Sequence, residues 1–240
     1  MNKNFLWFCS LVFLFLNSCV LDSDQEKVEV ENNSWSTTSI VASEVVDYNL
    51  EGSPLFNNPE LALGFPKGNG LNSGSLDVVS LGVNELGEGG WIILKFPQKI
   101  INGPGTDFKI FENSFSINEN EFFIEAAKIY LSEDNAIWYE FPSQVNSEYS
   151  NKNLNYYLGL AGVNPVYSNV LDSDSPKPEN DDSGGDFFDL EQMTSPIKEN
   201  GFKYLKIVDA GKGIADPGNE DPYNNGFDLD AVVGINYEEK

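Results

Sequence analysis

Hydrophobic and polar residues alternate with a period of two in several short segments of this chain. In the segment WIILKFP, residues 91–97, Ile92, Leu94 and Phe96 alternate with residues of the opposite face. Such alternation is typical of β-strands, in which successive side chains point to opposite faces. The same reasoning predicts further strands at residues 75–82, 107–113, 122–132, 137–142, 203–210 and 227–236.

Turn-forming sequences separate these segments. GEGG at 87–90, INGPG at 101–105 and EDNA at 133–136 each place glycine, proline or small polar residues between two candidate strands. We find no long stretch with helical periodicity, although 58–64 and 187–193 are candidates for short helical turns. The pattern therefore predicts an all-β fold with two sheets packed face to face, formed by one domain over residues 40–240.

Residues 145–185 depart from this pattern because they are rich in Asn, Ser, Asp and Pro. A loop of this length is usually functional or disordered. We expect a long surface loop. Its first half, YYLGLAGVNPVY at 156–167, is expected to pack on the domain, and its second half is expected to be mobile.

The first residues have the pattern of a bacterial export signal. Lys3 precedes an apolar run at 5–16, which is too short for an ordinary transmembrane helix. The sequence LNSC that follows resembles the lipobox of bacterial lipoproteins, and this resemblance implies that Cys19 carries fatty acyl chains such as palmitate. We therefore predict a signal peptide at 1–18 and an acidic, flexible tether at 19–39. The alternative is an ordinary secretory signal in which the cysteine is incidental.

Composition narrows the chemistry that the domain can perform. The chain has a formal net charge of −24, its 14 basic residues are all Lys, and it contains no His. This charge disfavours nucleic-acid binding, and the missing His excludes Ser-His-Asp triads and His-ligated zinc. Both cysteines, Cys9 and Cys19, precede the domain, so no disulfide is expected within it.

Acidic residues near the strand ends predict a calcium site. Asp228 and Asp230 alternate with apolar residues in FDLDAVV, so we expect the two carboxylates to share one face of a strand. Calcium binds six to eight oxygen atoms from carboxylates, amides and backbone carbonyls. The alternative is a solvated, acidic strand face. The candidate ligands are Asp107, Glu112, Asn113, Glu125, Asp228 and Asp230.

Other polar and aromatic residues have simpler interpretations. Trp91, Trp138 and Tyr139 could stack on a sugar ring, but packing within the sheets is the preferred reading. A further group of loop residues does not match the EF-hand pattern, and Asx-turn chemistry is expected for most of them. These loop residues are Asp186, Asp189, Asp209, Asp216, Asp221 and Asn224.

Two motifs carry a resemblance to a known family. DFKIFEN at 107–113 and GFDLDAV at 226–232, together with shorter pieces between residues 61 and 236, resemble a family of bacterial secreted and surface proteins usually called "cell surface protein". The resemblance implies a galactose-binding-like jelly roll, a fold that often holds a structural calcium ion. It implies no shared enzymatic activity.

We therefore expect a non-catalytic binding or adhesion module of the bacterial cell envelope, anchored by lipid to the outer membrane or cell surface and stabilised by calcium. Its ligand would be a carbohydrate or another surface protein. Two alternatives stay open: a glycoside hydrolase that uses carboxylates such as Glu112 and Glu125, and a purely structural envelope protein. The sequence does not decide whether the anchored domain faces the periplasm or the exterior.

Overall fold

The computed structural model describes residues 37–75, 77–211 and 226–239. The predicted signal peptide, Cys19 and the predicted tether up to residue 36 lie outside the described residues. Asp216, Asp221 and Asn224 also lie outside them.

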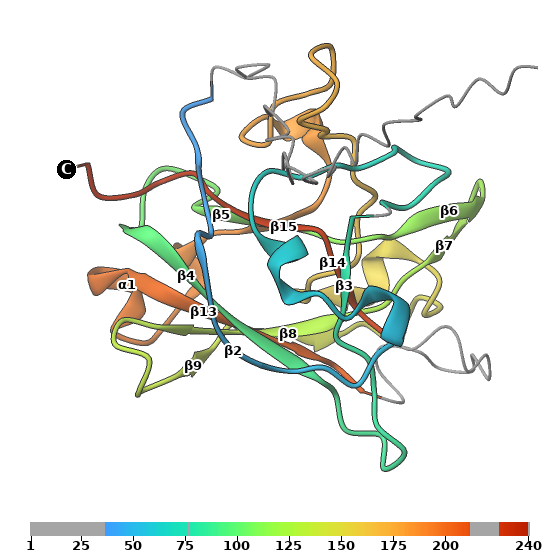
Figure 1. Cartoon of the computed structure of the whole chain (residues 1–240), viewed down its shortest axis with the longest axis horizontal. Coiled ribbons are helices and arrows are strands. Elements are labelled where there is room, and N and C mark those ends of the chain that lie inside the picture. The colour runs from blue at the N-terminus through green and yellow to red at the C-terminus, as the bar shows by residue number, and fades with distance from the viewer. Residues whose placement is uncertain (1–36, 76, 212–225, 240) are drawn as a thin grey trace, which may run out of the picture. The chain divides into compact units, whose positions relative to one another are not determined.

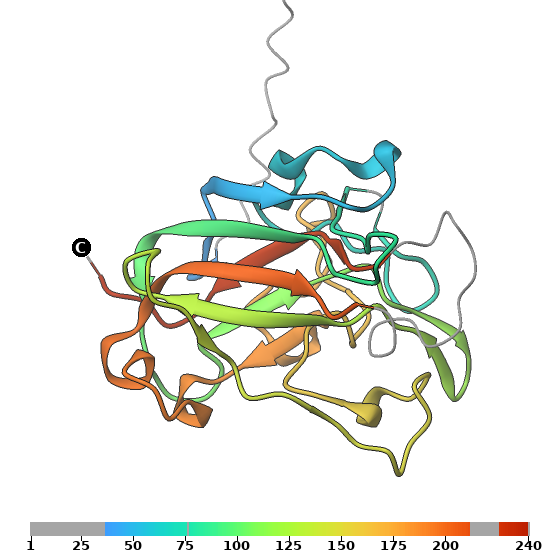
Figure 2. The same cartoon turned by 90° about the horizontal axis from the view of Figure 1, so that it is seen from below.

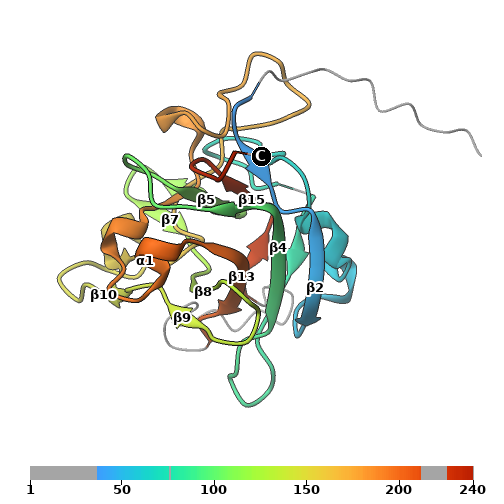
Figure 3. The ribbon, with the colours of Figure 1, turned by 90° about the vertical axis from the view of Figure 1, so that its left-hand side faces the viewer.

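The domain consists mainly of β-strands arranged in two larger antiparallel sheets, as the alternation predicts (Figure 1). One sheet has four strands in the order β1 (Ile40–Val41), β15 (Ala231–Gly234), β5 (Phe108–Phe111) and β12 (Asp186–Phe188). The other has five strands in the order β2 (Glu44–Asn49), β4 (Trp91–Ile100), β13 (Phe202–Asp209), β8 (Ala127–Ser132) and β9 (Tyr139–Glu140). Figure 2 shows β4, β13 and β8 side by side, and Figure 3 shows β5 and β15 in a second layer.

Smaller elements connect the sheets at their ends. Three two-stranded ladders pair β14 (Asp228–Leu229) with β3 (Val79–Ser80), β6 (Phe115–Asn118) with β7 (Glu121–Phe123), and β10 (Gln144–Val145) with β11 (Tyr157–Leu158). The described helices are short: η1 (Pro54–Phe56), η2 (Pro59–Ala62), η3 (Leu154–Tyr156), η4 (Asp181–Ser183), η5 (Leu190–Gln192) and α1 (Ile197–Asn200). None of the helices in the described part of the chain is long and apolar enough to cross a membrane.

The main core lies between the two larger sheets. Ile92, Leu94 and Phe96 of β4 are fully buried, which confirms the face assigned to them from the alternation. They belong to the same apolar cluster as Phe108 of β5 and Val232 of β15, so both sheets contribute to one core. An all-β sandwich follows from this arrangement.

Aromatic rings fill the centre of this core. The ring of Phe108 stacks on Phe188, with 4.8 Å between ring centroids, and meets Phe202 edge-on at 5.1 Å. Phe141 also packs edge-on against Phe188, at 5.1 Å. Edge-on and offset stacked rings add stabilisation beyond the area that they bury. Strands of both sheets are therefore held together through Phe108 and its neighbours.

The predicted strand 227–236 is wrong in one respect, because it is interrupted at Asp230. Before the interruption, β14 pairs with β3, and after it β15 pairs with β1 and β5. Phe227 and Leu229 belong to the main core, whereas Ala231 and Val233 belong to a separate apolar cluster. The apolar residues therefore do not share one face, since the change of pairing partner reverses the alternation.

Two other expectations change in detail. The predicted strand 122–132 divides into β7 and β8, and residues 124–126 between them belong to neither strand. The predicted helical turn at 187–193 begins instead as β12, whose partner is β5, and only residues 190–192 form the helical turn η5. The helical turn expected within 58–64 is present as η2.

The first half of the long loop packs on the domain, as predicted. Tyr157, Leu160 and Val163 are buried in an apolar cluster together with Ile124. The second half, which was expected to be mobile, is instead held to the domain by hydrogen bonds. The Lys109 ammonium donates hydrogen bonds to the Asn180 carbonyl and to Ser183 Oγ, and the Glu179 carboxylate accepts from the hydroxyl groups of Thr37 and Ser39.

Candidate functional site

Three buried carboxylates receive three consecutive backbone N–H groups at the start of β14. The N–H of Gly226 donates to Glu125 Oε1 at 2.8 Å, and that of Phe227 donates to Asp209 Oδ2 at 2.7 Å. The N–H of Asp228 donates to Glu112 Oε1 at 3.2 Å. Hydrogen bonds to a charged acceptor are the stronger kind. They fix the segment that carries Asp228 against the ends of β5 and β13.

The strand pairing explains why these residues meet. Glu112 follows β5 directly, and Glu125 precedes β8 by two residues. Asp209, the last residue of β13, is paired with Ala127 at the start of β8. Asp228, the first residue of β14, is paired with Ser80 of β3. Because β13 and β8 are antiparallel neighbours, Asp209 and Glu125 lie at the same end of their sheet. The hydrogen bonds from residues 226–228 then join these two acids to Glu112 of the other sheet.

Three side-chain oxygen atoms at this end of the sandwich are buried, and no described residue donates a hydrogen bond to them. Glu112 Oε2, Asn113 Oδ1 and Asp228 Oδ1 are shielded from solvent and accept no hydrogen bond within the described part of the chain. The Glu112 side chain is 1 % exposed. Leaving a buried polar atom unpaired costs about 1–3 kcal/mol, and more for a charged group. We name Glu112, Asn113 and Asp228 the oxygen cluster; a cation or a proton would satisfy these three oxygen atoms.

The electrostatics of the oxygen cluster favour added positive charge. Burial raises the pKa of Glu112 well above its ordinary value, and the negative charges of Glu125 and Asp228 raise it further. Burial also raises the pKa of Asp228, although hydrogen bonds from Ser80 and Asn113 oppose that effect. Carboxylates repel one another at short range and hold a proton or bind a cation more tightly as a result.

Within the described residues, no group of three or more His, Cys, Asp or Glu side chains is arranged to hold a metal ion. The oxygen cluster contains two carboxylates and one amide, and the amide comes from Asn113. This amide also donates from Nδ2 to Asp228 Oδ2 at 3.5 Å, which joins the two side chains. The donor set consists entirely of oxygen atoms, and such a set suits calcium rather than zinc.

Asp107 does not join the oxygen cluster. It precedes β5, whereas Glu112 follows the strand, so about 16 Å of extended chain separates their Cα atoms. Both of its carboxylate oxygens already accept hydrogen bonds: Oδ1 from the N–H of Gly103 at 2.7 Å and Oδ2 from the N–H of Leu190 at 2.7 Å. Asn236 Nδ2 donates to Oδ1 as well, at 2.8 Å. Asp107 therefore fastens loops at the opposite end of β5.

Asp230 also lies apart from Asp228. Both of its carboxylate oxygens accept from the N–H of Lys67, at 2.9 and 3.2 Å. The Lys67 ammonium itself forms an ion pair with Asp77. Burial raises the pKa of Asp230 to about 7. Asp228 and Asp230, which looked equivalent in the sequence, thus have different partners. Of the six candidate ligands, four come together: Glu112, Asn113, Glu125 and Asp228.

Three loop aspartates accept backbone hydrogen bonds. Asp189 accepts from the N–H of Glu191 at 2.8 Å, and Asp209 from that of Gly211 at 2.8 Å, which is the two-residue spacing of an Asx turn. Asp186 is different, because it accepts the N–H groups of Gly162, Val163 and Asn164 at 2.7, 3.0 and 3.2 Å. Its side chain thereby holds the packed half of the long loop onto β12.

The buried Asp186 predicts a measurable pH dependence of stability. Burial raises its pKa from 3.8 to about 6. The folded state therefore binds the proton more tightly than the unfolded chain, so the unfolding free energy falls as pH rises from about 4 to about 6 and is level above that. We expect Asp186 to lower the unfolding free energy by about 3 kcal/mol over this pH range, since one pKa unit corresponds to about 1.4 kcal/mol. Urea unfolding at pH 4 and 6.5 measures it, with Asp186→Asn as the variant that lacks the titration.

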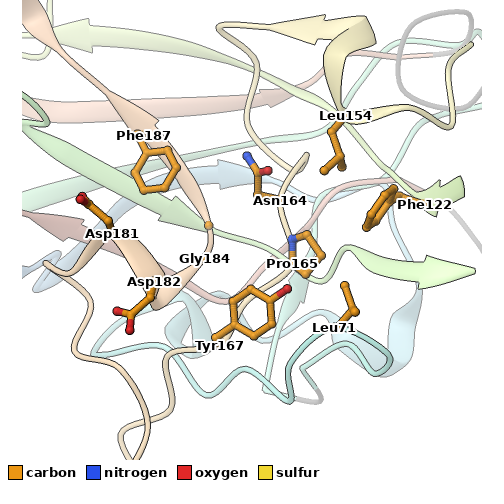
Figure 4. Close-up of a pocket in the computed structure, with 11 residues that line it drawn as sticks. Leu71, Phe122, Leu154, Asn164, Pro165, Tyr167, Asp181, Asp182, Gly184 and Phe187 are labelled. Carbon is orange, nitrogen blue, oxygen red and sulfur yellow. The ribbon is translucent and has the colours of Figure 1, made fainter. Parts of the chain in front are cut away.

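A pocket of about 240 Å³ lies beside β12 and the long loop (Figure 4). Asp181 and Asp182 stand at one end of it, the rings of Tyr167 and Phe187 lie next to them, and apolar side chains occupy the other end. This pocket could not be predicted from the sequence, because its residues come from segments that are distant along the chain. The apolar side chains are Leu71, Phe122, Leu154 and Pro165.

The aromatic residues considered for sugar stacking are partly buried. Lys206 Nζ lies 4.2 Å from the centre of the Trp91 ring, and Tyr139 packs against the main core. These contacts agree with packing within the sheets for Trp91 and Tyr139. Trp138 is half-buried and directly precedes β9.

Comparisons with known proteins do not extend this picture. No protein-family model matches the chain, and no curated protein sequence matches it significantly. The resemblance to the family called "cell surface protein", and the jelly-roll connectivity that it implies, stay predictions.

Proposed function

We propose that the chain is a non-catalytic binding module of the bacterial cell envelope, anchored by lipid on Cys19 and stabilised by a calcium ion. The observation that supports the calcium ion is the oxygen cluster at one end of the sandwich, whose three buried oxygen atoms accept no hydrogen bond from the described residues. The anchor rests on the signal-like first residues.

The residues present fit a calcium ion. Glu112 Oε2, Asn113 Oδ1 and Asp228 Oδ1 supply oxygen donors of the kinds that calcium prefers, and water and backbone carbonyls would complete its six to eight ligands. Bound there, the ion would supply positive charge between two carboxylates. Glu125 and Asp209 hold the neighbouring N–H groups, so the residues of the cluster are positioned in advance.

The first test of this proposal is thermal unfolding of the purified protein with calcium and with EDTA. Calcium at about 100 times its dissociation constant stabilises a fold by about 2.7 kcal/mol, and we therefore expect the melting temperature to rise by roughly 5–10 °C in a domain of this size. Glu112→Gln should abolish most of this rise, because it removes one charge from the cluster while keeping an oxygen for the N–H of Asp228. Glu119→Gln, at an exposed turn, is the matched control.

An identical melt in calcium and EDTA would reject the metal. In that case the raised pKa of Glu112 offers a different solution: a protonated Glu112 that donates to a neighbouring oxygen. Glu112→Gln would then preserve stability, since an amide can donate in the same way.

No observation on the described residues favours the alternative of a glycoside hydrolase. Glu112, Glu125 and Asp228 are not among the residues that line the pocket of Figure 4. The pocket has the features of a binding site, with apolar and aromatic side chains and a few polar groups. Binding is therefore the function that this geometry supports best.

A further inference from the structure

The pocket beside β12 has two chemically different ends (Figure 4). Asp181 and Asp182 mark one end, where Phe187 is 45 % and Tyr167 40 % exposed. The opposite end is aliphatic and aromatic, with Leu71 itself 41 % exposed. A ligand that fills the pocket must therefore present polar chemistry on one side and an apolar surface on the other.

The polar end carries an excess of negative charge. Lys109 is the nearby cation: burial lowers its pKa to about 8, and the negative charges of Asp181, Asp182 and Glu179 only partly oppose that effect. One ammonium cannot balance three carboxylates. In the described part of the chain, neither Asp181 nor Asp182 forms an ion pair with a basic side chain. Both aspartates are exposed, so their charge is available to a ligand.

The aromatic residues at this end suit a cation as well. Lys109 Nζ already lies 4.4 Å from the centre of the Phe187 ring. The ring is nevertheless nearly half exposed, and Tyr167 offers a second ring beside Asp182. Aromatic faces attract ammonium and guanidinium groups, and the methylene stem of such a side chain packs on the same surface.

We propose that this pocket binds a partner polypeptide through a lysine or arginine side chain next to an aliphatic residue. The basic group would lie between Asp181, Asp182 and the exposed rings, and the aliphatic residue would occupy the end formed by Leu71 and Phe122. This inference deepens the proposed function, since it rests on the chain being a binding module and names the chemistry of its partner. Charge complementarity is the argument for it: a cation meets an acidic rim on a chain of net charge −24.

The test is a titration of the calcium-saturated protein with acetyl-Gly-Leu-Lys-Gly-amide, followed by NMR chemical shifts and isothermal calorimetry. We expect saturable shifts at the pocket residues. The double variant Asp181→Asn with Asp182→Asn should weaken binding about fivefold or more, because two exposed charge contacts are lost. Phe187→Ala should weaken it as well. The matched control is Asp172→Asn with Asp174→Asn, a pair of exposed acids on the same loop that lies outside the pocket.

Three results would overturn the proposal. The first is the absence of saturable shifts up to millimolar peptide. The second is a lack of preference for the basic peptide: either a peptide in which glutamate replaces the lysine binds equally well, or a neutral oligosaccharide binds the same residues more tightly. The third is an unchanged affinity in the double aspartate variant. The calcium proposal is judged separately by the melting experiment, so peptide binding without a calcium effect, or the reverse, identifies which of the two has failed.

Discussion

Replacing Phe108 with alanine is expected to lower the unfolding free energy by about 3–5 kcal/mol, which is the usual cost of removing a buried aromatic side chain. Phe108 is fully buried, and its ring contacts Phe188 of the same sheet and Phe202 of the opposite sheet. The surrounding rings are attached to different strands, so they cannot all move inward to fill the cavity. Since domains are stable by only about 5–15 kcal/mol, this one change removes a large part of the total.

Urea unfolding of the wild type and the variant measures this effect. The matched control is Phe187→Ala, because Phe187 lies on the neighbouring strand in register with Lys109, next to Phe108, and points toward solvent. We expect a loss of about 1 kcal/mol or less for the control. Equal losses in the two variants would show that the aromatic cluster between the sheets is not the centre of the core.

The second large effect is expected for Asp186→Ala, which should lower the unfolding free energy by about 4 kcal/mol. The change leaves the N–H groups of Gly162, Val163 and Asn164 without their acceptor. Each buried donor left unpaired costs about 1–3 kcal/mol, and partial entry of water into the space reduces the sum. Amide hydrogen exchange should show the loss of protection concentrated at these three residues.

The control for this prediction is Asp189→Ala. Asp189 accepts one hydrogen bond, from the N–H of Glu191 at the start of η5, so we expect the loss of a single cap, about 1 kcal/mol. Comparable effects of the two aspartate changes would contradict the role assigned to Asp186 in holding the long loop.

The strands were largely predictable from the sequence because most of them alternate with one buried face. Ile92, Leu94 and Phe96 show this directly, and they lie in the core as predicted. The strands β1, β2 and β12 of the two larger sheets were missed, as were β6, β10 and β11 of the small ladders. In β2 (Glu44–Asn49) no side chain is fully buried, so the strand has no alternating buried face to recognise. β1 has two residues, too few for a period to be recognised, and in β12 (Asp186–Phe188) consecutive aromatic residues hide the alternation, although Phe187 is exposed and Phe188 is buried.

The break at Asp230 could not be predicted from the alternation. FDLDAVV keeps a regular period in the sequence, but the residues on either side of Asp230 pair with different strands. Periodicity reports which residues alternate within a strand, and it contains no information about where the pairing partner changes. The shared face assigned to Asp228 and Asp230 depended on a continuous strand.

The kinds of side chain at the candidate site, carboxylates and an amide, were predictable from the sequence. Which of the named residues belong to it was predictable only in part. Glu112, Asn113, Glu125 and Asp228 come together because each lies near the end of a strand and hydrogen bonds link all four to the segment 226–228. Asp107 belongs to the same DFKIFEN motif as Glu112, but the two residues lie at opposite ends of β5. The pocket depends on loop packing between residues more than 60 positions apart, such as Leu71 and Phe187, and no local pattern indicates such contacts.

The buried Lys109 has a consequence for chemical labelling of the protein. Burial lowers its pKa to about 8, so about a tenth of its amine is uncharged at pH 7 and would be nucleophilic if reagents could reach it. Its side chain is only 1 % exposed beneath the loop that contains Asn180 and Ser183. An acylating reagent can therefore reach Lys109 only when this loop opens. The rate of modification at Lys109 then reports how often the loop opens.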